Sequence, residues 1–123
     1  MMFALSSSLN FKLYAHPVDM RKSFDGLSNL VSNDLESNPT NGSVYIFINK
    51  LRNKAKLLHW QGGGFVLYYK RLEQGSFELP IYDATTASLT LDYSQLVLLI
   101  DGVSITNINR RKRYKQTQKQ MVV

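Results

Sequence analysis

The chain of 123 residues contains no cysteine. This absence excludes disulfides, thiolate nucleophiles and cysteine-ligated zinc. Long apolar runs are also missing, because the longest, LVLLI at residues 96–100, is far shorter than a membrane span. The first ten residues, MMFALSSSLN, carry no basic region, so we do not expect a signal peptide there. We therefore expect a cytoplasmic protein, and its length fits a single domain.

Acidic side chains are absent from a long central segment. Residues 37–72 carry six Lys or Arg and no Asp or Glu, a charge of +6. Residues 1–36 carry −1, residues 73–109 carry −5, and residues 110–123 add +6, for a total of +6. Charge placed in blocks favours a polyanion or an acidic partner. The alternative is that these basic side chains only face solvent, since solvent-exposed strand faces and tails are often basic.

Catalytic and metal-binding groups are sparse. No acid lies between Glu36 and Glu73 to complete a carboxylate triad on a sheet. Asp19 and Asp25 would lie about 240° apart around a helix, so they could not share a metal ion. His16 and His59 are isolated, and a zinc site needs more ligands. We expect no enzyme, no metal site and no cofactor.

Hydrophobic periodicity predicts one long amphipathic helix near the start. A short strand, NFKLYA at residues 10–15, precedes it, and Asp19 is a suitable N-cap for a helix over residues 20–36. Arg21 and Asp25 are four residues apart on its exposed side and could pair. Gly26 lowers helix stability, which indicates that a neighbour packs closely against it. The apolar face comprises Met20, Phe24, Leu27, Val31 and Leu35.

The remainder of the chain predicts strands and one short helix. SVYIFI, KAKLLHW and GFVLYYK alternate and are joined by short connections, which indicates an antiparallel meander. Further strands are expected at SFELPIY and ASLTL, followed by an apolar helix at residues 93–101 capped by Asp92 or Ser94.

The predicted fold class is α+β, with a small antiparallel sheet of three to five strands packed by one amphipathic helix. A short apolar C-terminal helix and a basic tail complete it. We expect a flexible N-terminus over residues 1–9, a single domain over residues 10–106 and a disordered tail over residues 107–123.

The stretch NKLRNKAKLLHWQGGGFVLYYKR combines cations and aromatic rings. If QGGG closes a hairpin, Lys54 and Lys56 lie roughly opposite Lys70 and Arg71. Like charges opposed across a sheet are destabilising, and an anionic ligand would explain why four are present. This convergence depends on the hairpin register.

Several motifs, in order, resemble one known family. PVDMRKSFDGL, FIN, KLLHWQGGGF and YYKRLEQGSF are similar to the TnpB-type accessory protein (second open reading frame) of the insertion-sequence 66 family of bacterial transposons. The resemblance spans roughly residues 10–80. The loop NKLRNK has fewer arginines than the family pattern, and the turn has Gln61, Gly62 and Gly63 where acidic or polar residues are frequent. Lysine binds phosphate without arginine's planar fork, which disfavours base readout by this loop.

The resemblance implies a role in transposition beside a separate transposase that carries the catalytic acids. We expect a non-catalytic accessory protein that binds DNA, as transposon ends or non-specific duplex, mainly through backbone phosphates. The alternative is a protein-interaction subunit that docks on an acidic surface of the transposase without contacting DNA, with the apolar helix supplying the hydrophobic contact. Other proteins of the element are further expected partners, and a nuclease is least favoured.

The candidate DNA-binding residues are cationic and come from the helix start, the hairpin and the tail. They are Arg21, Lys22, Lys50, Arg52, Lys54, Lys56, Lys70, Arg71, Arg110, Arg111, Lys112, Arg113 and Lys115. Trp60 is the candidate for stacking on unpaired bases. A core position is the alternative for the aromatic residues, although two lysines share the strand face of Trp60.

Overall fold

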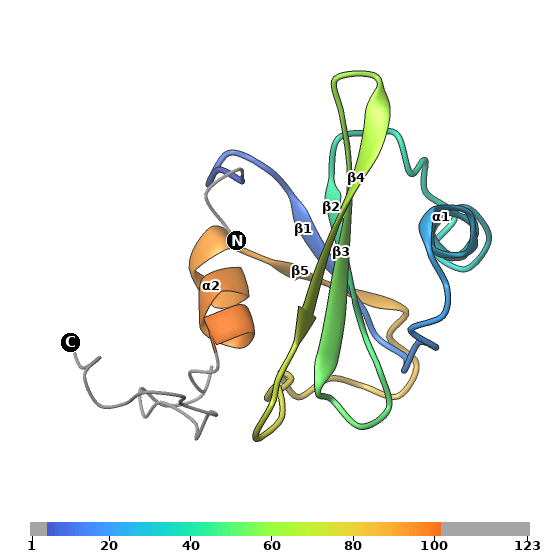
Figure 1. Cartoon of the computed structure of the whole chain (residues 1–123). Coiled ribbons are helices and arrows are strands. Elements are labelled where there is room, and N and C mark those ends of the chain that lie inside the picture. Colours follow the sequence, from blue (N-terminus) through green and yellow to red (C-terminus); the bar gives the residue numbers. More distant parts are fainter. Residues whose placement is uncertain (1–4, 102–123) are drawn as a thin grey trace.

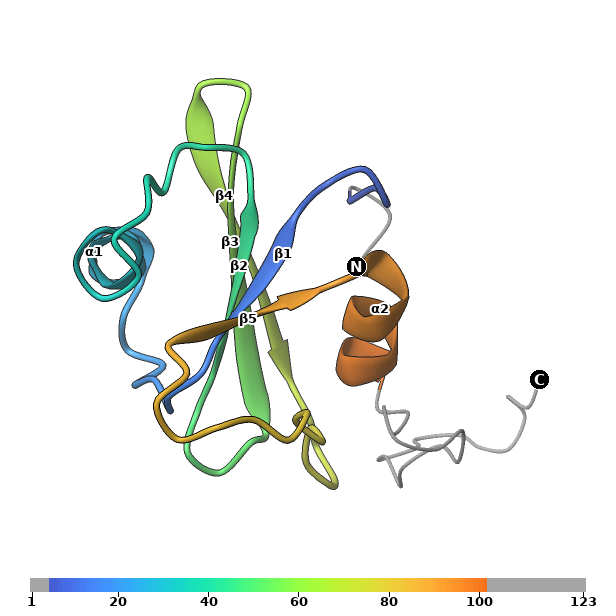
Figure 2. The same ribbon diagram turned by 180° about the vertical axis from the view of Figure 1, so that it is seen from behind.

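The computed structural model describes residues 5–101, so the tail cations and residues 1–4 lie outside the described part. A five-stranded sheet carries one helix on each face (Figure 1). In chain order the elements are β1 (Phe11–Tyr14), α1 (Phe24–Asn33), β2 (Val44–Ile48), β3 (Lys54–Gln61), β4 (Gly64–Arg71), β5 (Ser88–Leu91) and α2 (Tyr93–Asp101). Figure 2 shows from behind that α1 and α2 remain on opposite sides of the sheet.

The sheet is mixed, with strand order β4-β3-β2-β1-β5. The predicted antiparallel meander of β2, β3 and β4 is confirmed, and ASLTL forms the predicted strand β5. The expectation of a purely antiparallel sheet is wrong, because β1 pairs with β2 in parallel. The chain between these strands passes through α1 and returns in the same direction, and such a crossover is what a parallel pair requires.

A two-residue turn closes the β3–β4 hairpin. Gln61 pairs with Gly64, which leaves Gly62 and Gly63 as the central turn residues. Their φ angles are 58° and 80°. Positive φ at both central positions is characteristic of a type I′ turn, which glycine adopts without steric cost.

Two apolar layers form because the strands alternate. Ile46 points into the cluster that includes Leu57 and Leu96, on the α2 face. Tyr45 and Phe47 point into the other cluster, with Leu27 and Val31 of α1. All five residues of β2 are buried, since both of its faces are covered. No helix within residues 5–101 is long and apolar enough to cross a membrane.

Three local predictions need correction. Helix α1 begins at Phe24, with Ser23 at its N-cap position, so residues 20–22 form a preceding turn. Arg21 pairs with Asp19 instead of Asp25. SFELPIY, at residues 76–82, forms no strand.

Other local predictions hold. Gly26 is closely packed, since a Cβ built there would lie 3.1 Å from Lys22 Cβ. Helix α2 has the predicted bounds, and Asp92 caps it: Asp92 Oδ1 accepts from the Gln95 backbone N at 2.7 Å, and Gln95 Oε1 accepts from the Asp92 N at 2.9 Å.

Candidate nucleic-acid interface

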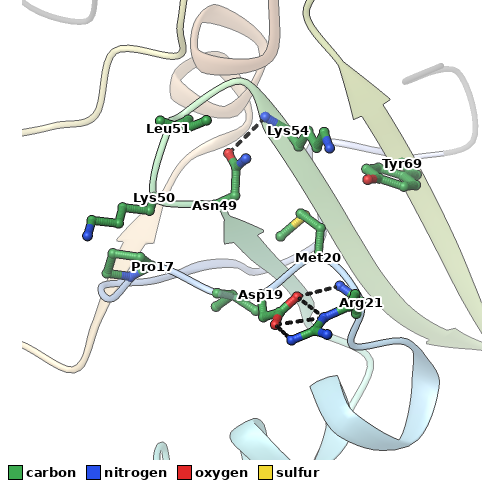
Figure 3. Close-up of a pocket in the computed structure, with 10 residues that line it drawn as sticks. Pro17, Asp19, Met20, Arg21, Asn49, Lys50, Leu51, Lys54 and Tyr69 are labelled. Carbon is green, nitrogen blue, oxygen red and sulfur yellow. Dashed lines mark hydrogen bonds and ion pairs between the residues drawn. The ribbon is translucent and has the colours of Figure 1, made fainter.

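Three segments meet at one end of the sheet and enclose a hollow of about 490 Å³ (Figure 3). They are the turn after β1, the loop between β2 and β3, and the adjoining ends of β3 and β4. We call this site the basic hollow. It is lined by Pro17, Val18, Asp19, Met20, Arg21, Asn49, Lys50, Leu51, Lys54 and Tyr69.

The turn after β1 is organised by the Asp19 carboxylate. Asp19 Oδ1 accepts from the backbone N of Arg21 at 2.9 Å, and Asp19 O accepts from the Lys22 N at 3.0 Å. The Arg21 guanidinium binds the same carboxylate, with Nη2 donating to Oδ2 at 2.7 Å. The side-chain hydrogen bond from Arg21 is the main reason that the pKa of Asp19 falls to about 2. The Arg21 side chain remains 91% exposed, and its other N–H groups can donate to a further anion.

Lys56 fastens this turn to the sheet. Its Nζ donates to the carbonyl oxygens of Met20 at 2.7 Å and Lys22 at 2.8 Å. It also lies 4.7 Å from the ring centroid of Tyr69. Lys56 is only 6% exposed. Its burial and these partners argue against the direct phosphate contact predicted for Lys56, and they give its ammonium a structural role.

The loop between β2 and β3 is held by Asn49. Its Oδ1 accepts from the backbone N of Asn53 and of Lys54, each at 3.0 Å, and its Nδ2 donates to Asn53 Oδ1 at 2.8 Å. Arg52 has a positive φ of 59°, and its carbonyl accepts from the Phe77 N at 2.6 Å. The exposed side chains of this fixed loop are Lys50, Leu51 and Arg52.

Arg52 extends the cationic surface beyond the basic hollow. It lines a neighbouring hollow of about 280 Å³ that shares Pro17, Asn49 and Lys50 with the first.

The sequence offered no signal for the part played by Asn49, because its partners lie in its own loop and an isolated asparagine predicts only a turn.

The hairpin register settles which cations converge. Lys54 pairs directly with Arg71, as the hairpin model required. Lys70 pairs with Ala55 and points to the other face, where its Nζ donates to the carbonyl of Ile100 at 2.9 Å. The predicted convergence is therefore wrong for Lys70, because successive side chains of a strand alternate between faces.

Few carboxylates offset the remaining cations. Arg71 Nε donates to Glu73 Oε2 at 2.7 Å, in an exposed ion pair. Within residues 5–101, no carboxylate pairs with Lys22, Lys50, Arg52 or Lys54. We call Lys22, which follows Arg21 in the chain, and Arg52, Arg71 and Glu73, which line the neighbouring hollows, the rim of the basic hollow. The basic hollow and its rim thus have six cationic side chains and two carboxylates, an excess of four positive charges. The cations are Arg21, Lys22, Lys50, Arg52, Lys54 and Arg71, and the carboxylates are Asp19 and Glu73.

Trp60 lies at the opposite end of the hairpin, next to the glycine turn. It is half-buried and packs edge-on against Phe65, with ring centroids 5.0 Å apart at 75°. The aromatic ring in the basic hollow is Tyr69 instead. Among residues 5–101, no three His, Asp or Glu side chains gather to hold a metal ion.

Comparison with known proteins identifies the family. The model of the family described as IS66 Orf2 like protein matches residues 9–110. The chain belongs to this family. The matched region includes all three segments of the basic hollow, and the resemblance recognised from the motifs is confirmed. Membership of the IS66 Orf2-like family implies an accessory role associated with transposition, and this family has no known catalytic role.

Two relatives come from Sinorhizobium fredii. The uncharacterized protein y4jC is 28% identical over 117 residues, which cover 95% of this chain and 98% of the relative. The uncharacterized protein y4hO is 31% identical over 85 residues, which cover 69% of this chain and 72% of the relative. No solved structure matches the chain.

Proposed function

We propose that this IS66 Orf2-like protein is a non-catalytic accessory factor that binds DNA through its backbone phosphates, using the basic hollow and its rim. One observation carries the proposal: Arg21, Lys50 and Lys54 come from three separate segments and line one hollow. Internal hydrogen bonds hold the turn that carries Arg21 and the loop that carries Lys50 and leads to Lys54. The protein thus holds like charges together in advance, and an anionic ligand would relieve their repulsion.

Backbone phosphate is the anion that this surface suits best. The cations are spread over three segments, so they can contact successive phosphates of one strand. Such contacts position a protein on DNA without reading its sequence. Five of the six cations are lysine or lie beside a carboxylate: Lys22, Lys50 and Lys54 are point charges, and the guanidinium groups of Arg21 and Arg71 bind Asp19 and Glu73. This composition favours sequence-independent contact over base recognition.

Docking on an acidic surface of the transposase is the second candidate. It is favoured by two hydrophobic side chains that lie among the cations and are exposed to a partner: Leu51 is 76% exposed and Tyr69 is 53% exposed. An apolar anchor with a charged rim is the usual anatomy of a protein interface. Helix α2 would not supply the anchor predicted for this alternative, because Leu96, Leu99 and Ile100 are buried against the sheet.

Fluorescence anisotropy with the full chain tests the proposal. Binding of a labelled duplex is measured at several salt concentrations, with transposon-end and random sequences. Four to six phosphate contacts predict a slope of log K against log salt of about −4 to −5. Both sequences should bind alike. No binding below about 10 µM at 50 mM salt would sink the proposal and promote transposase docking.

Charge variants locate the contact. Replacing Lys50 and Lys54 together by Met should make the slope less steep by about 2, or ~0.9 for each lost contact. The control for loss of a lysine elsewhere on the sheet is Lys12→Met, which removes one charge from β1, where Lys12 Nζ donates to Thr90 Oγ1. An unchanged slope in the double variant would place binding outside the basic hollow and overturn the assignment of the site.

A further inference from the structure

We propose that Tyr69 is a stacking platform for an unpaired nucleobase, flanked by cations that hold the phosphates of the same strand. The inference rests on the proposed function and deepens it, because it names unpaired DNA as a ligand. Tyr69 takes the place that the sequence suggested for Trp60.

The position of Tyr69 separates it from the other rings of the sheet. It lies on β4, an edge strand, and is 53% exposed. It borders the basic hollow and also a hollow of about 320 Å³ that is lined by Lys54, Arg71 and Glu73. Figure 3 shows the Lys54 side chain extending toward it. The ring therefore borders two hollows, and cations that could hold a phosphate line each of them.

The ring is fixed before any ligand arrives. The Lys56 ammonium lies against it, 4.7 Å from its centroid, and is itself held by the carbonyls of Met20 and Lys22. A ring that is already ordered loses little conformational freedom on binding. Since Lys56 occupies one side of the ring, the exposed remainder of Tyr69 is the surface open to a base.

The chemistry of the ligand follows from this combination. Every nucleobase has a π face, and stacking on an aromatic ring between phosphate-binding cations is how single strands are held without sequence preference. Within a duplex those faces are covered by neighbouring base pairs. Tyr69 can stack only on a base that is unpaired or terminal. Trp60 lacks this setting, because its ring packs against Phe65 at the glycine turn.

The test compares a labelled oligothymidine with a duplex of equal phosphate number, both with the full chain. Tyr69→Leu keeps the bulk and removes the π face. It should weaken single-strand binding about 5- to 150-fold, the equivalent of ~1–3 kcal/mol per stacked base, and weaken duplex binding by a clearly smaller factor. Tyr69→Phe is the matched control and should bind both forms as the natural protein does. Equal loss on both forms, or no loss, overturns the inference and leaves the phosphate proposal standing.

A second readout does not depend on the variants folding. Oligothymidine with a central 2-aminopurine is saturated with the natural protein, and its fluorescence is recorded. Stacking should quench the probe when the natural protein is bound. Undiminished fluorescence at saturation overturns the stacking proposal. Failure of the natural protein to bind either DNA form instead removes the proposed function itself, so the two failures are distinguishable.

Discussion

At the scale of single residues, Lys54 and Lys56 lie two positions apart on one face of β3 but differ in role. Lys56 holds the turn after β1 to the sheet, whereas Lys54 lines the basic hollow. The Lys56→Met variant keeps the apolar stem but leaves the carbonyls of Met20 and Lys22 without their ammonium donor. A hydrogen bond to a charged group contributes about 1.5–3 kcal/mol, so the free energy of unfolding should fall by about that amount. Urea denaturation followed by circular dichroism measures it.

Lys54→Met is the matched control for this prediction. Lys54 is half-buried and lines the basic hollow. Its replacement should change the free energy of unfolding by less than about 0.5 kcal/mol and make the salt slope of DNA binding about 0.9 less steep. If both variants destabilise the fold equally, the structural role assigned to Lys56 is wrong.

Tyr14 and Asp34 predict a response to alkaline pH. Burial, and then the hydrogen bond and the negative charge of Asp34, raise the pKa of Tyr14 from 10.0 to about 12. The folded state thus favours the protonated phenol. This contribution to stability is fully present below pH 10 and is lost as pH rises to about 12. Thermal melting between pH 9 and pH 12 should show a shallower decline for Tyr14→Phe than for the natural protein; parallel declines would contradict the prediction.

At the scale of elements, the loop between β2 and β3 depends on one side chain. Asn49→Ala removes its hydrogen bonds to Asn53 and Lys54. We expect a loss of about 1–3 kcal/mol in the free energy of unfolding and weaker DNA binding by the folded protein, since Lys50 and Lys54 lose their fixed backbone. Chemical denaturation and anisotropy measure the two effects.

Asn38→Ala is the control for this loop. Asn38 Oδ1 also accepts two hydrogen bonds, from Thr40 N at 2.9 Å and Thr40 Oγ1 at 2.7 Å, but in an exposed turn of another segment. It should destabilise the fold less and leave DNA binding unchanged. Unaltered binding by Asn49→Ala would show that the loop needs no preorganisation.

The elements best predicted from the sequence have local causes. The β2–β4 meander follows from alternation and short connections, and α2 follows from its Asp92 cap. The start of α1 was mispredicted. Asp19 is a residue type that favours the N-cap position, but its carboxylate binds the backbone N and the guanidinium of Arg21 in a turn that precedes the helix. The parallel β1–β2 pair was missed because periodicity identifies strands without ordering them in a sheet.

The same limit applies to the candidate site. Its end of the hairpin was predicted, and Lys54 does oppose Arg71. Lys70 was misplaced because it neighbours Arg71 on β4, and successive side chains of a strand point to opposite faces whatever the register. The burial of Lys56 could not be foreseen, since its partners are backbone carbonyls more than thirty positions away, of Met20 and Lys22. Because every residue has a backbone carbonyl, the sequence does not indicate which carbonyl a lysine will bind.

At the scale of the whole molecule, charge is polarised, with the acidic side chains concentrated after β4. The segment of residues 73–109 carries five acids and no Lys or Arg. Of these acids, Glu73 borders the cationic surface, where it pairs with Arg71 beside Tyr69. A bound phosphate would compete with Glu73 for Arg71 and would be repelled by its carboxylate. Glu73 therefore weakens the affinity of the surface for any polyanion.

Glu73→Gln should accordingly bind DNA more tightly. One unit charge removed near a phosphate contributes roughly 0.5–1 kcal/mol in a watery environment, or about two- to fivefold in affinity at low salt. The gain should fade as salt rises, because the screening length is only ~10 Å at 0.1 M. The matched control is Asp92→Asn, which removes the same charge at α2 while keeping a capping side chain. If both variants tighten binding equally, net charge governs DNA binding and the local surface around Arg71 does not.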